Sequence, residues 1–269
     1  MSSRQAELRI AVCGATGRMG RSLAELAATD PGLDMVGGLA RSSHEPGYTS
    51  HGGYPVIQAP EEAAALLREA QVVIDFSSPE LLRRLIAQRE ALAGRALVVG
   101  TTGLGAEELG LLDGLADQCA VLTAPNFSVG VNLLVALAEE AARVLGEEYD
   151  VEVVEAHHRR KADAPSGTAL QLGQAVARGR GVELDAVRQD GRSGRSGERP
   201  RGEIGFHALR GGDIVGEHRV YLIGERERIE LAHVAADRAL FAEGALRAAR
   251  WIAGRPAGRY TMRDVLGLG

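Results

Sequence analysis

The chain has 269 residues, which is enough for one large domain or for two smaller domains that each bury a hydrophobic core. Hydrophobic residues make up 45% of the sequence and charged residues 25%, and these proportions exclude a globally disordered chain. The formal net charge is −5, so the sequence has no net basic field with which to bind a nucleic acid.

The first half of the chain alternates short apolar strands with amphipathic helices. Strands are expected over residues 8–13, 34–40, 72–76, 96–100 and 120–124. Helices are expected over residues 21–29, 61–70, 79–93 and 106–117. The strands lack the alternation of a half-exposed strand, which is typical of a parallel sheet with helices on both faces. The pattern predicts an α/β fold with a Rossmann-like, doubly wound parallel sheet.

A glycine-rich turn joins the first strand to the first helix, with the sequence Gly14-Ala15-Thr16-Gly17-Arg18-Met19-Gly20. Glycines at such a turn allow close backbone approach, and the start of the following helix attracts a pyrophosphate. The position at the first β–α turn favours a dinucleotide site. The alternative is a turn that is rich in glycine for packing alone.

The end of the second strand should select the cofactor, because an acidic residue there binds the ribose 2′-hydroxyl of NAD. The sequence places Arg41, Ser42 and Ser43 at this point, while Asp34 opens the strand and lies at its wrong end. A cation with two hydroxyls suits a 2′-phosphate, so we expect NADPH to be preferred and NADH to remain possible. The alternative is an ordinary surface arginine.

Two more loops follow the carboxyl ends of predicted strands, where ligands bind in open sheets. Their sequences are Gly100-Thr101-Thr102-Gly103 and Ala124-Pro125-Asn126-Phe127-Ser128. Their small and polar residues can line a ribose and a nicotinamide. Alternatively, each is a simple turn.

Beyond residue 128 the pattern becomes that of a mixed α+β domain. The expected elements are helices over 131–146 and 166–178 and strands over 150–158, 203–210, 213–224 and 228–235. The last three strands alternate, as antiparallel strands with one exposed face do. The Gly/Ser/Arg-rich stretch 191–203 predicts a mobile loop, and a final helix over 238–254 is expected to return to the first domain. The expected boundaries are 1–128 with 238–269 for the dinucleotide-binding domain, and 129–237 for a substrate domain with a mixed or antiparallel sheet.

The most informative stretch of the second half is EAHHRRKADAPSGT, residues 155–168, in which five consecutive cationic or titratable side chains follow a strand. Asp163 or Ser166 can cap the next helix, and Pro165 suits its first turn. The amides of Ser166, Gly167 and Thr168 would then point at an anion. Together with an amine and two imidazoles, they predict a site for a small substrate that carries carboxylates. The alternative is a solvated basic loop.

This stretch also contains the single lysine of the chain. The chain has 31 lysines and arginines, and only Lys161 is a lysine. Arginine replaces lysine at most surface positions, but its guanidinium does not give up a proton near neutral pH. A lysine retained beside His157 and His158 therefore favours chemistry that needs a proton-donating amine over an accident of composition.

Other features exclude further classes of protein. No apolar run approaches the roughly 18 residues of a membrane span, and the opening MSSRQAELRI is too polar for a signal peptide. Cys13 and Cys119 lie in predicted strands and lack the spacing of metal ligands. We expect a cytoplasmic protein with no membrane segment and no metal.

The chain resembles the 4-hydroxy-tetrahydrodipicolinate (dihydrodipicolinate) reductases of diaminopimelate and lysine biosynthesis nearly from end to end. The resemblance rests on GATGRMG, DFSSPE, VGTTGL, APNFSVGVN, EAHHRRKADAPSGTA, IGFHALRGGDIVGEH, DRALFAEGALRAARWI and MRDVLGL, in the order of the family. Two positions depart from it. Arg160 stands where relatives often have histidine, and Ala40 replaces the acidic residue that commonly precedes the ribose-binding arginine.

The resemblance implies an NAD(P)H-dependent oxidoreductase and a homotetramer. It implies that His157 is the acid/base residue, that Lys161 is the proton donor, and that His158, Gly167 and Thr168 bind the substrate carboxylates. The implied cofactor-binding residues are Gly14 to Met19, Arg41, Gly100 to Thr102 and Ala124 to Phe127.

Two other classes of protein share parts of the pattern. Extended short-chain dehydrogenases have a similar glycine turn but need Tyr-x-x-x-Lys, and none of the five tyrosines has a lysine four residues later. A regulatory protein that senses a dinucleotide would explain the turn but would leave the cluster of His157, His158 and Lys161 without a purpose.

Overall fold

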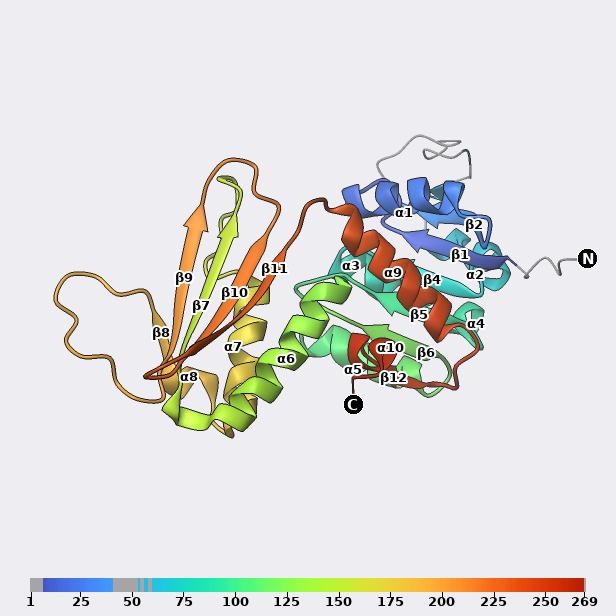
Figure 1. Ribbon diagram of the computed structural model, residues 1–269. Coiled ribbons are helices and arrows are strands. Elements are labelled where there is room, and N and C mark those ends of the chain that lie inside the picture. Colours follow the sequence, from blue (N-terminus) through green and yellow to red (C-terminus); the bar gives the residue numbers. More distant parts are fainter. Residues whose placement is uncertain (1–6, 41–52, 54–55, 58–59, 269) are drawn as a thin grey trace, which may run out of the picture. The chain divides into compact units, whose positions relative to one another are not determined.

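The computed structural model describes residues 7–40, 53, 56–57 and 60–268 (Figure 1). The chain forms two compact units. The first unit contains Met1–Ser128 and Ala239–Gly269, and the second contains Val129–Arg238. Within the described ranges, no helix is long and apolar enough to cross a membrane.

The first unit is built on a seven-stranded, wholly parallel sheet with the order β12-β6-β5-β4-β1-β2-β3. Its strands are β1 (Leu8–Cys13), β2 (Leu33–Leu39), β3 (Val56–Ile57), β4 (Val72–Asp75), β5 (Ala96–Val99), β6 (Ala120–Thr123) and β12 (Gly258–Tyr260). From β1 the chain first adds strands on one side and then, from β4 onward, on the other. The predicted doubly wound α/β sheet is confirmed, and its switch point lies between β1 and β4, where open sheets bind their ligands.

Helices cover both faces of this sheet. They are α1 (Arg18–Thr29), η1 (Pro60–Glu62), α2 (Ala64–Glu69), α3 (Pro79–Ile86), α4 (Arg89–Leu92), α5 (Ala106–Ala116), α9 (Ala239–Ile252) and α10 (Met262–Leu266). Ile10 and Val12 of β1 face a core shared with α1 and α9, whereas Ala11 and Cys13 face a core shared with α2, α3 and α5. Burial on both faces explains why the strands show no alternation.

Two helices of this unit need comment, one that is divided and one that packs closely. The helix expected over 79–93 is divided in two, because the backbone leaves the helical conformation at Gln88, with ψ +28°. The closing helix α9 packs in the first unit, and Gly244 is essential to the fit, since a Cβ there would lie 1.9 Å from the carbonyl oxygen of Phe127.

The second unit contains a five-stranded mixed sheet with the order β11-β10-β7-β9-β8. Its elements are α6 (Val129–Leu145), η2 (Gly146–Glu148), β7 (Asp150–His157), α7 (Gly167–Arg180), α8 (Leu184–Val187), β8 (Arg188–Asp190), β9 (Ile204–Arg210), β10 (Glu217–Ile223) and β11 (Arg228–Val234). Residues of α6 and α7 share a core with one face of the sheet. Beta strand alternation is clear in β10, where every second residue is buried.

The prediction of antiparallel pairing is right for two strands and wrong for a third. β10 pairs antiparallel with β7 and β11, but β9 pairs parallel with β7 and β8. The helix α7 returns the chain to the starting end of the sheet before β8, so β8 runs in the direction of β7. Alternation records only which face of a strand is buried and carries no information on its direction.

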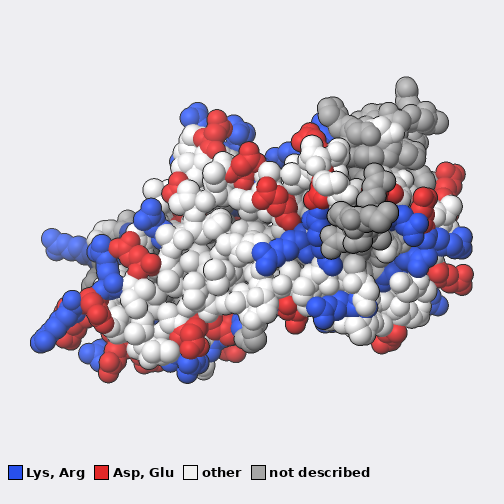
Figure 2. Space-filling model, turned by 45° about the vertical axis from the view of Figure 1, so that its right-hand side comes forward, with Lys and Arg blue, Asp and Glu red and all other residues white. Residues whose placement is uncertain are grey.

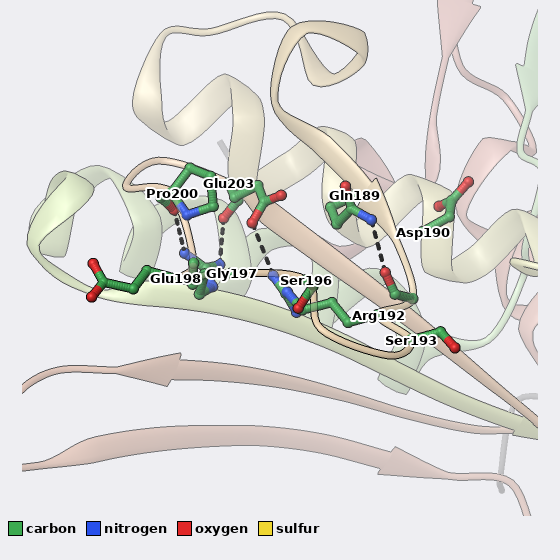
Figure 3. Close-up of a pocket in the computed structure, with 11 residues that line it drawn as sticks. Gln189, Asp190, Arg192, Ser193, Ser196, Gly197, Glu198, Pro200 and Glu203 are labelled. Atoms are coloured by element: carbon green, nitrogen blue, oxygen red, sulfur yellow. Dashed lines mark hydrogen bonds and ion pairs between the residues drawn. The ribbon is translucent and has the colours of Figure 1, made fainter.

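The glycine-rich stretch 191–203 lines a pocket (Figure 3) and is bonded to strand β7 through two arginines. Arg192 contacts Glu152 and Glu203 at 3.0 Å. Arg199 contacts Asp150 at 2.6 Å and Glu152 at 3.0 Å. The composition predicts a mobile loop, but the ion pairs with Glu152 and Asp150 hold the stretch to β7, and these partners lie 40 and 49 residues away in the chain.

Candidate functional site

The glycine turn after β1 depends on two glycines for its shape. Gly14 has φ +81°, and a Cβ there would lie 2.4 Å from the carbonyl oxygen of Phe76. A Cβ on Gly20 would lie 2.3 Å from the carbonyl oxygen of Gly14. These glycines let β1, α1 and the loop after β4 approach closely, which is the packing that a dinucleotide turn requires.

The start of α1 offers backbone donors to an anion. Its first intrahelical hydrogen bond runs from the amide of Arg21 to the carbonyl of Gly17, and no side chain caps the helix. The amides of Arg18 and Met19 therefore precede the helical ladder, at the end that favours negative charge. By contrast, the amides of Gly14 and Ala15 both donate to Leu39 in β2. Within the predicted turn, the donors suited to a pyrophosphate thus lie at its helical end.

Aromatic rings pack behind the carboxyl edge of the sheet. The rings of Phe76 and Phe127 lie edge to face at 5.3 Å, and Phe127 is buried. A Cβ on Gly100 would lie 2.1 Å from the ring of Phe76. Among the residues predicted in the 124–127 loop, the side chain of Phe127 is therefore part of the packing beneath this edge of the sheet. Ala124 is also buried.

A buried carboxylate links the loops after β4 and β5, and the sequence analysis did not select it. The Asp75 carboxylate accepts hydrogen bonds from the hydroxyls of Ser77 and Thr101, each at 2.5 Å. The amide of Ser77 donates to Thr101 Oγ1 at 2.8 Å. Burial raises the pKa of Asp75, against the lowering effect of the two hydroxyls. The signal in the sequence is an acid at the end of an apolar strand, two residues before a pair of serines.

This network changes the role expected for Thr101. Its hydroxyl is bonded to Asp75 and its side chain is buried, so only the backbone of its loop is free of that bond to face a ligand. Cys13 lies beside the same acid, and burial followed by the charge of Asp75 raises the pKa of its thiol well above the usual value.

The residue expected to select the cofactor lies outside the described residues. These residues begin again at position 53, so Arg41, Ser42 and Ser43 have no described structure. Ala40, which precedes them, is buried at the end of β2.

In the second unit, strand β7 ends in a set of contacting side chains that we call the His157 cluster, consisting of Glu155, His157, Ser166, Arg210 and His218. The His157 ring nitrogen Nδ1 lies 2.5 Å from Glu155 Oε2. Arg210 from β9 contacts both oxygens of the same carboxylate at 2.7 Å. The amide of Ser166 donates to Glu155 Oε1 at 3.0 Å. Glu155 therefore joins β7, β9 and the start of α7.

His218 of β10 completes the cluster. Its ring lies 5.1 Å from that of His157, and its Nε2 lies 3.1 Å from Ser166 Oγ. Burial, with the nearby charge of His157, lowers the pKa of His218 to about 4, so its ring is neutral at neutral pH. Burial also lowers the pKa of His157, although Glu155 acts in the opposite direction.

The five titratable residues of the basic stretch divide into two groups. His157, His158 and Lys161 are partly buried, whereas Arg159 and Arg160 are exposed. Arg160 pairs with the exposed Asp213 at 2.8 Å. The solvated-loop alternative thus describes the two arginines, and it does not describe the imidazoles and the amine.

The amine of Lys161 has an acidic neighbour. Its Nζ lies 2.9 Å from Asp163 Oδ2, and only 22% of the lysine side chain is exposed. The hydrogen bond from Lys161 lowers the pKa of Asp163. The sequence suggested a lysine surrounded by cations, but the fold of the loop brings the carboxylate of Asp163, two residues further on, into contact with the Lys161 amine.

The start of α7 differs in detail from its prediction. Ser166 is the N-cap, its Oγ accepts from the amide of Ala169 at 3.2 Å, and Pro165 lies before the cap rather than in the first turn. Because the Ser166 amide donates to Glu155, the candidate anion donors are the next amides, those of Gly167 and Thr168. Gly167 is exposed, and a Cβ there would meet no atom within 4 Å.

These features define a class of protein. One unit is an α/β nucleotide-binding domain with an uncapped helix at its switch point, and the other presents imidazoles, an amine and a helix N-terminus suited to a carboxylate. Among the described residues, no group of three or more His, Cys, Asp or Glu side chains could hold a metal ion. The class is that of Rossmann-type oxidoreductases.

The chain belongs to the dihydrodipicolinate reductase family. Residues 8–127 match the family's N-terminal region (Dihydrodipicolinate reductase, N-terminus), and residues 130–266 match its C-terminal region (Dihydrodipicolinate reductase, C-terminus). The resemblance inferred from the motifs is thereby confirmed over both units.

Curated relatives match over almost the whole chain. The 4-hydroxy-tetrahydrodipicolinate reductase of Methylocella silvestris is 46% identical over 98% of this chain and 98% of its own. That of Alkalilimnicola ehrlichii is 48% identical over 97% of this chain and 99% of its own. A solved dihydrodipicolinate reductase from Paenisporosarcina sp. with dipicolinate bound has a TM-score of 0.73 at 23% identity, covering 95% of this chain and 97% of its own. The fold is therefore shared with that enzyme, and the chain is an oxidoreductase of this family.

Proposed function

We propose that this chain reduces 4-hydroxy-tetrahydrodipicolinate to tetrahydrodipicolinate in diaminopimelate and lysine biosynthesis, with His157 and Lys161 handling the proton. The observation that carries the assignment is the His157 cluster with Lys161 at the end of β7, directly before the start of α7. It combines groups that bind carboxylates with groups that exchange protons, as reduction of a cyclic dicarboxylate requires.

The first unit is the proposed site of the nicotinamide cofactor. The fit rests on the uncapped start of α1 and on Gly14, where a Cβ would clash with the carbonyl oxygen of Phe76 and prevent the close turn. The proposed cofactor-binding residues are Gly14, Ala15, Thr16, Gly17, Arg18, Met19, Arg41, Gly100, Thr101, Thr102, Ala124, Pro125, Asn126 and Phe127. When bound, the reduced nicotinamide supplies a hydride.

The second unit is the proposed substrate site. His158, Ser166, Gly167 and Thr168 are assigned to the substrate, with the amides at the start of α7 facing a carboxylate. A carboxylate of the substrate would replace Asp163 as the partner of Lys161, since both present the same oxygen acceptors to the ammonium. Support for a dicarboxylate comes from the dipicolinate bound by the solved relative.

Substitution of Lys161 by arginine tests the proton-donor role. Lys161→Arg keeps a cation opposite the substrate but removes a group able to donate a proton, so kcat for NADPH oxidation with freshly generated substrate should fall about 10²–10⁴-fold. Binding of dipicolinate, measured by calorimetry, should persist. Arg160→Lys is the matched control, because Arg160 is exposed and pairs with Asp213. Near-normal turnover of Lys161→Arg would overturn the role of Lys161.

We assign NADPH as the preferred cofactor on the basis of Arg41 and its two serines, which follow a strand without a terminal acid. Replacing Arg41 with alanine should lower kcat/KM for NADPH more than for NADH. An unchanged ratio of the two values would reject the assignment.

We further propose that the chain is a homotetramer, as the family resemblance implies. Support comes from apolar side chains exposed on the strands of the second unit, namely Leu209, Ile223, Ile229 and Val234, which are 38–58% exposed. Figure 2 shows a broad uncharged area between groups of charged side chains on the face that it presents. Sedimentation equilibrium tests this proposal, and a monomer at micromolar concentration would refute it.

A further inference from the structure

The carboxylate of Glu155 is saturated with hydrogen-bond donors. Only 1% of its side chain is exposed. Oε2 contacts His157 Nδ1 and one guanidinium nitrogen of Arg210, while Oε1 contacts the Ser166 amide and the other guanidinium nitrogen. Burial raises the pKa of Glu155, but the bonds from Arg210 and His157 outweigh it and hold the pKa below its usual value. The acid is therefore ionised at neutral pH.

An ionised carboxylate can only accept hydrogen bonds, so the ring nitrogen that contacts it must carry a proton. The nitrogen that contacts Glu155 is Nδ1 of His157, which lies 2.5 Å from Oε2. Neutral His157 is then the Nδ1–H tautomer, and the lone pair that exchanges a proton with another molecule lies on Nε2. Gly216 preserves space at that side of the ring, since a Cβ there would lie 3.2 Å from Nε2.

We propose that Glu155 is a positioning residue that holds His157 as the Nδ1–H tautomer and thereby assigns proton transfer to Nε2. The same carboxylate receives the amide of Ser166, so it also fixes the first turn of α7, where the substrate carboxylate is proposed to bind. One acid thus aligns the proton-transfer group with the anion-binding group. The role in turnover rests on the proposed function, but the tautomer itself does not.

The charged and titratable neighbours of His157 predict how its pKa responds when Glu155 is replaced. Glu155 lies on its own strand, Arg210 on β9, His218 on β10, and Lys161 in the loop that follows β7. Lys161 and Arg210 oppose protonation of His157, and Glu155 favours it. Removing the negative charge of Glu155 should therefore lower the pKa of His157 further and move its limb of the pH–rate profile to lower pH.

Nuclear magnetic resonance of the full-length chain tests the tautomer directly. With ¹⁵N-labelled histidine, long-range ¹H–¹⁵N spectra above the pKa of His157 report which ring nitrogen is protonated, and the signals are assigned by their loss in His157→Gln. We expect a protonated Nδ1 and a bare Nε2 in the wild-type chain. A wild-type Nε2–H tautomer would overturn the proposal.

The variant Glu155→Gln tests the consequence for turnover. Its amide donates and accepts, so the Nε2–H tautomer should become populated. We expect kcat to fall about 10²-fold or more, with KM for NADPH unchanged and the His157 limb at lower pH. Retention of both wild-type kcat and the wild-type pH profile would reject the positioning role. If the wild-type chain does not turn over this substrate, the proposed function fails, while the tautomer measurement still decides the assignment of Glu155.

The chain offers a matched control on the same strand. Glu152 also holds a carboxylate between arginines and a histidine, with Arg192 and Arg199 at 3.0 Å and His207 at 2.8 Å. Glu152→Gln removes the same charge from a similar network away from His157. It should leave the tautomer of His157, kcat and the pH profile unchanged, and a matching loss in this variant would count against a specific role for Glu155.

Discussion

The buried ring of His218 makes the stability of the second unit depend on pH. His218 is 4% exposed, and burial followed by the charge of His157 lowers its pKa from 6.5 to about 4. Above pH 6.5 both the folded and the unfolded chain hold a neutral ring, and the full stability is present. As the pH falls from 6.5 through 4, the unfolded chain binds a proton that the folded chain excludes, so unfolding becomes easier.

The magnitude follows from the width of this window. Each pKa unit corresponds to about 1.4 kcal/mol, so the shift of His218 removes about 3 kcal/mol from the free energy of unfolding once the pH reaches 4. This is a large fraction of the roughly 5–15 kcal/mol that stabilises an ordinary domain. Burial also lowers the pKa values of His157 and His233, which act in the same direction.

A comparison of wild type with His218→Gln isolates the contribution of this ring. Glutamine keeps a polar group near Ser166 but does not titrate. Urea denaturation between pH 7 and pH 4.5, followed by hydrogen exchange of peptides from α7 and β10, should show a steeper loss in the wild-type chain. Equal pH slopes in the two chains would refute the reasoning. A steeper slope in the variant would show that the ring is protonated when folded.

Two further predictions concern the first unit. Gly20→Ala places a Cβ 2.3 Å from the carbonyl oxygen of Gly14 and should destabilise the unit by about 1–3 kcal/mol, whereas the control Gly110→Ala, in α5 with no atom within 4 Å, should stabilise it by up to about 1 kcal/mol. Urea midpoints followed by the fluorescence of the single tryptophan, Trp251 in α9, measure both, and equal effects would contradict the packing argument. Asp75→Asn replaces one acceptor oxygen by a donor and should cost about 1–3 kcal/mol while raising KM for NADPH, because the loops after β4 and β5 lose their common anchor. Unchanged stability and KM would show that the Asp75 bonds do not hold these loops.

The strength of the sequence lies in patterns that one segment contains by itself. Non-alternating strands predicted a sheet buried on both faces, and β1 does place Ile10 and Ala11 in opposite cores. The alternation of the later strands predicted one buried face, as β10 has. The direction of β9 could not be predicted in this way, because the path of the chain through α7 and β8, and not the burial pattern, determines which end of the sheet it enters.

The same distinction holds for the candidate site. His157, His158, Lys161 and the start of α7 lie within one short stretch, so their types and spacing alone indicated proton transfer beside an anion. The burial of Glu155 could also have been predicted, because its position continues the alternation of Val151 and Val153, which are buried in β7.

What the tertiary structure decided is which groups act on that stretch. Arg210, Gly216 and His218 come from more than 40 residues further along the chain, and only the pairing of β7 with β9 and β10 brings them to Glu155 and His157. The local sequence was enough to locate the candidate site, because helix capping and residue spacing act over a few residues. The protonation and orientation of His157 were decided by the fold, because burial and hydrogen bonding depend on neighbours that the sequence places far apart.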